Sequence, residues 1–378
     1  MSKRAYSGAG IFDGERLHAG KTLLAEDGVF NAVIDAGAVP DGYEVTDLGG
    51  GALMPAFVDL QVNGGGGVMF NDETNVDGIV AIARAHATTG TGALLPTLIT
   101  DTPERTAAAV DAVEAAIGRG VPGILGIHLE GPHLSITRKG AHDPALIRPM
   151  QDRDEAFLRA AAERLPNIMV TVAPENVSTD QIARLAGAGV IVSIGHTDCS
   201  FEQAEAAFAA GARCVTHLFN AMSQMGNREP GLVGATLKAA GVSAGLIADG
   251  IHVHPASMRA ALDSKMPPGD IFLVTDAMST VGSDITEFRL NGRRVLRHDG
   301  RLTLEDGTLA GADLDFATAI SVLVEKVGLD PARAYAMATS APAAVLSDAR
   351  GFGSFSPGKP LNAIHLDHRG RPCPLAAG

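Results

Sequence analysis

Short apolar runs recur along most of the chain, and alanine-rich segments with helical composition lie between them. Continuous apolar runs that alternate with helices are typical of the buried parallel strands of an α/β protein. The predicted strands end at Val62, Ile99, Glu130, Glu175, Thr197, Phe219, His252 and Ala277. The predicted helices between them include residues 76–88, 103–117 and 255–263. Eight such strand–helix units over this length predict a (β/α)8 barrel, the TIM-barrel architecture.

The two ends of the chain show a different pattern. Up to Gly51, short strand-like pieces are separated by turn signals. These signals are Asp13-Gly14, Asp27-Gly28 and Asp41-Gly42. Residues 362–367 add one more alternating strand near the C-terminus. We therefore expect a second, small β-sandwich domain built from both termini (residues 1–51 and 350–378), with the barrel spanning residues 52–349.

The segment after the eighth predicted strand departs from the strand–helix alternation. Residues 288–311 alternate around Asn-Gly, Asp-Gly and Asp-Gly pairs and predict an inserted hairpin. Residues 314–327 and 331–346 then predict two helices that close the domain.

Composition and charge narrow the class of protein. Hydrophobic residues make up 46% of the chain and charged residues 19%, which suits a compact core. The formal net charge of −13 disfavours nonspecific binding to nucleic acid or to anionic membranes, so an anionic substrate needs a local basic pocket. No apolar run approaches the roughly 18 residues of a membrane span, and no signal peptide is predicted. Three cysteines without C-x-x-C spacing predict free thiols in a reducing cytoplasm.

The strand ends carry candidate chemistry. His196 and His217 each end a predicted strand of one strand–helix–strand unit, so they emerge side by side at one edge of the sheet. Taken alone, the pair could also be two unrelated histidines. Glu130 ends another strand, and the three side chains together match the ligand set of a catalytic Zn2+ site, which leaves one position open.

Asp276 ends the eighth predicted strand and is the candidate acid–base group. It could take a proton from a water molecule and deliver it to a leaving amine. The competing interpretation is a turn or N-cap aspartate. Beside the candidate ligands, Asp276 indicates a metal-dependent hydrolase. The remaining histidines without a partner pattern are predicted to be surface or turn residues: His133, His254, His298, His365 and His368.

Several motifs also carry a resemblance. They are PAFVDLQVNGGGG, HLEGPH, KGAH, VTVAPE, SIGHTDCS, THLFNAM, ADGIHVHP and VTDAM. With them the chain resembles the amidohydrolase superfamily and, over almost its whole length, the N-acetylglucosamine-6-phosphate deacetylase family. The resemblance implies deacetylation of N-acetylglucosamine 6-phosphate in amino-sugar catabolism or cell-wall recycling, by a homodimer. Relatives with His-x-His after the first strand bind a second metal, whereas Gln61 and Asn63 stand there in this chain. We therefore expect one metal ion per subunit, most simply Zn2+, with Fe2+ or Co2+ also suited to the ligands.

The resemblance also implies roles for residues around the substrate. His142 would donate a hydrogen bond to the acetyl carbonyl oxygen and stabilise the oxyanion. Asn220, Ala221, Arg228 and His252 would bind the phosphate. Some phosphate contacts in the family's dimers come from the neighbouring subunit, so Arg228 and His252 are candidates to reach the partner's site. The complete set of implied substrate-binding residues is Gln61, Asn63, Ala141, His142, Asn220, Ala221, Arg228, Asp249, His252, Leu309, Ala310 and Gly311.

Two alternatives stay open at this point. One is a cyclic amidase or deaminase of the same superfamily that acts on an uncharged ring. The other is a noncatalytic barrel scaffold that has lost its metals, which the missing His-x-His pair would explain. The complete set of Glu130, His196, His217 and Asp276 argues against the scaffold.

Overall fold

The computed structural model describes residues 2–373 and 375. Its larger part is a barrel built from one eight-stranded parallel sheet, whose strands follow one another in chain order. These strands are β8 (Phe57–Val62), β11 (Thr91–Ile99), β12 (Ile127–Glu130), β13 (Ile168–Val172), β14 (Ile191–Ile194), β15 (Cys214–Val215), β16 (Ser243–Leu246) and β17 (Ile271–Leu273). A parallel bridge between Val62 and Ala277 closes the sheet on itself. The predicted (β/α)8 barrel is therefore confirmed, with one strand inside or overlapping each predicted run.

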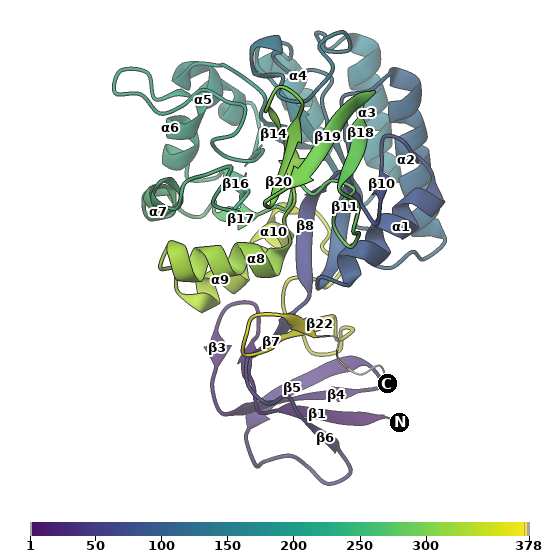
Figure 1. Ribbon diagram of the computed structural model, residues 1–378, viewed down its shortest axis with the longest axis vertical. Coiled ribbons are helices and arrows are strands. Elements are labelled where there is room, and N and C mark those ends of the chain that lie inside the picture. The colour runs from purple at the N-terminus through teal and green to yellow at the C-terminus, as the bar shows by residue number, and fades with distance from the viewer. Residues whose placement is uncertain (1, 374, 376–378) are drawn as a thin grey trace.

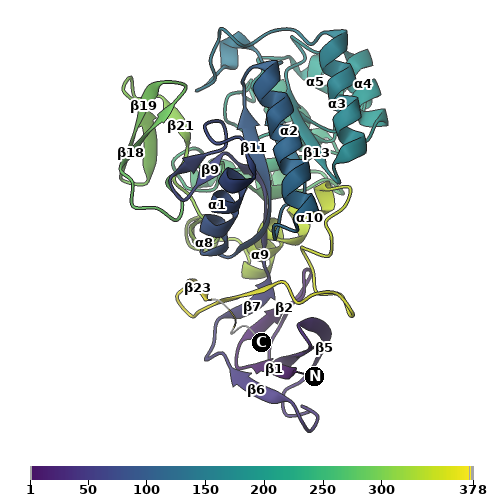
Figure 2. The ribbon, with the colours of Figure 1, turned by 90° about the vertical axis from the view of Figure 1, so that its right-hand side faces the viewer.

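Helices cover the outside of the barrel (Figures 1 and 2). They are α1 (Val76–Ala87), α2 (Pro103–Gly118), α3 (Asp152–Arg164), α4 (Thr179–Gly187), α5 (Phe201–Ala209), α6 (Gly231–Lys238) and α7 (Pro255–Ser264). Local sequence explains where several of them begin. Ser178 and Ser200 form capping boxes with glutamines three residues later, and Thr102 caps α2 just before Pro103.

The two predicted closing helices are partly as expected. The first is α8 (Phe316–Ser321), which continues as one π-helical turn over Val322–Lys326. The second is divided into α9 (Pro331–Ala338) and α10 (Ser340–Val345). The division falls at Thr339, whose backbone leaves the helical region (φ −131°, ψ −84°) and whose side chain donates to the carbonyl oxygen of Tyr335. Among the described residues, no helix has both the length and the apolarity to cross a bilayer.

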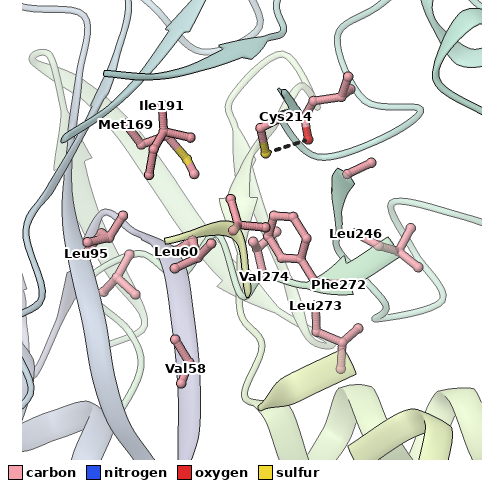
Figure 3. Close-up of a cluster of buried hydrophobic side chains, with 14 of the residues drawn as sticks. Val58, Leu60, Leu95, Met169, Ile191, Cys214, Leu246, Phe272, Leu273 and Val274 are labelled. Atoms are coloured by element: carbon pink, nitrogen blue, oxygen red, sulfur yellow. Dashed lines mark hydrogen bonds between the residues drawn. The ribbon is translucent and has the colours of Figure 1, made fainter. Parts of the chain in front are cut away.

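Aliphatic and sulfur-containing side chains and the ring of Phe272 form a buried hydrophobic cluster among the barrel strands (Figure 3). Leu60, Met169, Cys214, Phe272 and Val274 are each no more than 2% exposed. The barrel interior also buries a hydrogen-bonded group of polar side chains, His128, Thr171, Ser193 and Thr216. Apolar packing and these hydrogen bonds together fill the barrel, so chemistry is left to its rim.

A smaller unit lies below the barrel in Figure 1 and contains both ends of the chain. One sheet has the order β5-β4-β1-β6 and the other β23-β22-β7-β2-β3. Their strands are β1 (Lys3–Ser7), β2 (Gly10–Phe12), β3 (Leu17–His18), β4 (Lys21–Glu26), β5 (Val29–Asp35), β6 (Glu44–Asp47), β7 (Ala52–Pro55), β22 (Ala363–Leu366) and β23 (Pro372–Cys373). An apolar cluster around Tyr6, Leu23 and Leu53 joins strands of both sheets. Strand β22 pairs with β7, so the two chain ends share a sheet. The domain limits at residues 51/52 and 349/350 stay a prediction. Strand β7 belongs to the smaller unit, because it pairs with β2 and β22.

The segment after β17 forms a four-stranded antiparallel sheet where a single hairpin was expected. Its strands are β18 (Glu287–Leu290), β19 (Arg293–His298), β20 (Arg301–Leu304) and β21 (Leu309–Ala312). We call it the insertion sheet. Asn291-Gly292 and Asp299-Gly300 make its two-residue turns with positive φ at every central position, which Asn, Asp and Gly adopt at low cost. Its apolar side packs on Met69, Ile99 and Met278, beside the short hairpin of β9 (Gly64–Gly65) and β10 (Val68–Met69).

Candidate active site

The C-terminal end of the barrel holds a cavity of about 380 Å³. Loops after the strands form most of its wall, and the insertion sheet supplies the rest. The predicted site residues that line it are Asn63, Glu130, Ala141, His142, His196, His217, Asn220, Ala221, His252, Asp276, Leu309 and Gly311. Four others, Gln61, Arg228, Asp249 and Ala310, are not part of its lining.

The side chains at the strand ends enter the cavity because the backbone turns sharply there. The regular strands β14, β15 and β17 end a few residues earlier than predicted, before His196, His217 and Asp276. All three residues have positive φ, of 48°, 27° and 50°. This left-handed region is uncommon outside glycine and is concentrated at functional sites.

Three side chains form a compact donor set. Glu130 Oε1 lies 3.3 Å from His196 Nε2 and 3.2 Å from His217 Nε2, and the two Nε2 atoms are 3.0 Å apart. Tetrahedral ligands bound at about 2.0–2.1 Å are separated by roughly 3.3 Å, so these distances fit one small divalent cation. His142 adjoins the set, with Nε2 3.8 Å from Glu130 Oε2. Glu130, His142 and His196 likewise lie close enough together to hold an ion.

Hydrogen bonding around the set also suits a cation. His196 Nδ1 lies 2.8 Å from the Arg138 carbonyl oxygen and donates to it, so the lone pair of Nε2 faces Glu130 and His217. Burial raises the pKa of Glu130, but the hydrogen bonds that His196 and His217 donate when protonated, and the charge they then carry, outweigh burial and hold this pKa well below its ordinary value. A buried carboxylate facing an imidazole lone pair is the arrangement that a bound cation stabilises.

Two amides hold the carboxylates in place. Gln61 Nε2 donates to Glu130 Oε1 at 3.0 Å and to Asp276 Oδ1 at 3.1 Å. Asn63 Nδ2 donates to the same Asp276 oxygen at 2.7 Å, while Asn63 Oδ1 is buried without a hydrogen-bond partner among the described residues. Amide N–H groups therefore face both carboxylates.

The environment of Asp276 shifts its protonation. Burial, and then the negative charge of Glu130, raise the pKa of Asp276 to about 6. A carboxyl group with a pKa near the working pH is suited to accepting and returning a proton.

His142 is held in one tautomer. The backbone N–H of Thr100 donates to His142 Nδ1 at 3.3 Å, and the Thr100 hydroxyl lies 2.8 Å from the same nitrogen, where it can donate as well. With Nδ1 as the acceptor, the ring proton is on Nε2, which faces Glu130 and the cavity. Burial, followed by the charge of His196, lowers the pKa of His142 to about 3. His142 is thus a neutral imidazole that can donate a hydrogen bond from Nε2.

A model of the amidohydrolase family matches residues 52–376. The chain belongs to the amidohydrolase family. It is 42% identical to an N-acetylgalactosamine-6-phosphate deacetylase of Shewanella sp. over 320 residues, which cover 85% of this chain and 80% of the relative. It is 34% identical to the N-acetylglucosamine-6-phosphate deacetylase of Haemophilus influenzae, over 88% of this chain and 87% of that one.

Solved structures give the same result. The N-acetylglucosamine-6-phosphate deacetylase of Pasteurella multocida superposes with a TM-score of 0.93 at 31% identity, over 98% of this chain and 97% of that one. The Mycobacterium smegmatis deacetylase in complex with N-acetyl-D-glucosamine 6-phosphate superposes with a TM-score of 0.90, also at 31% identity and with the same coverage. The resemblance predicted from the motifs is therefore confirmed.

The four predicted residues outside the cavity of this amidohydrolase have other positions. Gln61 lies behind the carboxylates, as described above. Asp249 supports a cavity residue, since its Oδ2 accepts from His252 Nδ1 at 2.6 Å. Arg228 is exposed on the loop between α5 and α6. Ala310 packs in the apolar cluster under the insertion sheet.

The cavity of the amidohydrolase also contains residues that the sequence patterns did not single out. These are Ile99, Thr137, Arg138, Ile247, Met278 and Thr308. Ile99 ends β11 and Ile247 follows β16. Both could have been found by considering apolar as well as polar residues at the strand ends. Thr308 comes from the insertion sheet, and nothing in its local sequence marks it. His133 and His365 were expected to be surface or turn residues; His133 lies in a bend and His365 in β22, and neither is at the surface. They are 2% and 6% exposed, and a backbone carbonyl oxygen, that of Arg148 or of Gly50, satisfies a ring nitrogen of each.

Proposed function

We propose that this amidohydrolase removes the acetyl group of N-acetyl-D-glucosamine 6-phosphate to give D-glucosamine 6-phosphate and acetate. The observation that carries the proposal is the hydrogen-bonded unit of Glu130, Gln61 and Asp276 next to two imidazoles at the barrel rim. The deacetylase relatives described above supply the substrate class. Such a reaction serves amino-sugar catabolism or cell-wall recycling, and the unpaired cysteines suit the cytoplasm as its location.

Glu130, His196 and His217 are the residues proposed to hold one divalent cation, with Zn2+ first and Fe2+ or Co2+ as alternatives. When bound, the cation supplies Lewis-acid chemistry, which polarises an amide carbonyl group and makes a water molecule more acidic. The main-chain oxygen of Arg138 keeps His196 Nε2 free for this role.

Asp276 is the proposed acid–base group. Its Oδ1 accepts hydrogen bonds from Gln61 and Asn63, which leaves Oδ2 to accept a proton from the attacking water molecule. The same oxygen then returns the proton to the departing amine nitrogen. The pKa near 6 lets one carboxyl group serve in both directions close to neutral pH.

Two neighbours are proposed to orient the acetamido group. His142 donates from Nε2 to the acetyl carbonyl oxygen, and this donor strengthens its bond as negative charge develops on that oxygen. Asn63 lines the cavity, and its Oδ1 is a buried acceptor without a hydrogen-bond partner among the described residues, so we assign to it the substrate N–H group.

The rest of the substrate is assigned by resemblance and position. Asn220, Ala221 and His252 line the cavity on the side proposed for the phosphate. Leu309 and Gly311 border the proposed sugar pocket, with Asp249 and Ala310 behind it. Arg228 is exposed and outside the cavity of its own chain, which supports a homodimer in which it reaches the phosphate in the neighbouring subunit.

The test is acetate release by protein of known metal content. N-acetylglucosamine 6-phosphate, its galactosamine epimer and unphosphorylated N-acetylglucosamine are compared side by side. The epimer is included because the Shewanella relative is named for it. We expect phosphate-dependent release that Asp276→Asn abolishes. No release from either phosphorylated sugar by metal-loaded protein would refute the proposal.

A further inference from the structure

The loop that carries His142 rests on the candidate metal ligands. It follows β12 and includes one short 3-10 turn, η1 (Ile136–Arg138). Ser135 N donates to the His196 carbonyl oxygen at 2.8 Å, and the Arg138 carbonyl oxygen accepts from His196 Nδ1. One side of this loop is therefore fixed to the strand end that carries His196.

The other side of the loop meets the insertion sheet. Ala141 packs against the apolar cluster formed by Ile99, Met278 and Leu304. Arg293, at the start of β19, donates from Nη2 to the Ala141 carbonyl oxygen. Arg293 is not part of the cavity lining, and its side chain meets the site at this loop. Figure 2 shows the insertion sheet standing to one side of the barrel, in a position to support a rim loop.

The Ala141–His142 peptide unit is thus held at both ends. Its oxygen accepts from Arg293, and its N–H donates to the Lys139 carbonyl oxygen at 3.0 Å. The His142 ring is held separately, by the Thr100 N–H at Nδ1. A planar peptide unit fixed at oxygen and nitrogen fixes the direction in which the next side chain leaves the backbone. The guanidinium contact is charge-assisted and therefore stronger than an ordinary peptide hydrogen bond.

We propose that Arg293 is a positioning residue that holds the Ala141–His142 peptide so that His142 Nε2 points into the active site. The insertion sheet then serves as the support of the catalytic loop. The kinetic part of this inference rests on the proposed function. The structural part, that Arg293 orders the loop, does not.

An acidic side chain, Asp306, also lies where the insertion sheet meets the loop that carries His142. Asp306, in the turn between β20 and β21, has a lowered pKa, chiefly because of hydrogen bonds from Thr308 and then because of the positive charges of Arg293 and Lys139. Arg293 from the sheet and Lys139 from the loop therefore lie around the same carboxylate.

The neighbouring arginine provides a matched control. Arg294 is exposed and pairs with Glu287 within the insertion sheet, without contact to the loop among the contacts described. Arg293→Met and Arg294→Met remove the same charge from adjacent positions of one strand. Arg293→Lys keeps the charge and a donor and serves as the conservative variant.

The first readout is amide hydrogen exchange of the full-length, metal-loaded protein. In Arg293→Met we expect exchange over residues 135–146 to rise about tenfold or more, and in Arg294→Met to stay at the wild-type rate. The second readout is the split between kcat and KM for acetate release. Arg293→Met should lower kcat by about 10- to 100-fold, with KM and metal content near wild type, since small misplacements of a catalytic group have effects of this size. Arg293→Lys should recover part of the loss.

Two results would overturn the inference. One is a loop exchange rate and kcat in Arg293→Met within twofold of wild type. The other is an equal effect of Arg294→Met, which would indicate general weakening of the insertion sheet. If the wild-type protein releases no acetate, the proposed function fails, and the exchange comparison still decides whether Arg293 orders the loop.

Discussion

Asn63 donates a 2.7 Å hydrogen bond to Asp276, a residue 213 positions away in the sequence. The two residues follow the first and last strands of the barrel, where the Val62–Ala277 bridge closes the sheet. The hydrogen bond from Asn63 thus holds the proposed acid–base group across the seam where the first and last strands meet. The site therefore forms only when the barrel is closed.

This relationship makes the pH profile sensitive to Asn63. The hydrogen bond from Asn63 lowers the pKa of Asp276, against the larger raising effect of burial. Asp276 must be ionised to accept a proton, so activity should fall below about pH 6 in the wild-type enzyme. In Asn63→Ala the lost hydrogen bond should move this acidic limb to higher pH. The pH dependence of kcat/KM measures it, and an unchanged limb would contradict the role given to Asn63.

Removal of one candidate ligand should abolish metal retention. In His217→Ala, only Glu130 and His196 of the predicted ligand set remain. We therefore expect the variant to keep no metal after dialysis and the wild type to keep one equivalent. Metal content by elemental analysis checks this. A chelator should lower the Tm of the wild type and leave that of the variant unchanged, because only a ligand of the native state stabilises it. His298→Ala, an exposed histidine, is the control and should behave as wild type.

Gly140 should be essential to the loop that carries His142. It has a φ of +53°, and a Cβ there would lie 3.3 Å from His196 Cε1. Gly140→Ala should therefore displace His196 and reduce both metal affinity and kcat by about tenfold or more. Gly120 also has a positive φ, of +70°, but a Cβ there meets no atom within 4 Å. Gly120→Ala carries the same backbone strain of about 1–2 kcal/mol without the contact. A similar loss of activity in both variants would attribute the effect to strain alone.

Acid should destabilise the fold through buried neutral histidines. Burial lowers the pKa of His86 to about 4, and its Nε2 donates to the Gly64 carbonyl oxygen. Between pH 6.5 and 4 the unfolded chain binds a proton at this position and the folded chain does not, so stability falls as pH falls through this window. The contribution is up to about 3 kcal/mol. Urea unfolding of His86→Gln at several pH values should show a weaker pH dependence than the wild type, by about one proton. An identical dependence would rule out His86 as a source.

The sequence by itself determined the barrel and much of its rim. A parallel strand that is buried on both faces has a continuous apolar sequence. The residue that follows such a strand lies on the rim of the barrel, and this placement does not depend on contacts with distant segments. Glu130, His196, His217 and Asp276 could therefore be placed together from local pattern and strand order alone. The Asn-Gly and Asp-Gly turns of the insertion sheet are equally local signals.

Only the tertiary structure decided how those residues are used. The protonated nitrogen of His142 depends on Thr100, the orientation of His196 on the Arg138 carbonyl oxygen, and the environment of Asp276 on Gln61 and Asn63 across the seam. The contacts of His365 with the Gly50 carbonyl oxygen and of Arg293 with the Ala141 carbonyl oxygen join segments far apart in the chain. Such contacts are set by how loops and sheets pack in three dimensions, and a hydrogen bond between distant segments leaves no periodic trace in the sequence around either partner.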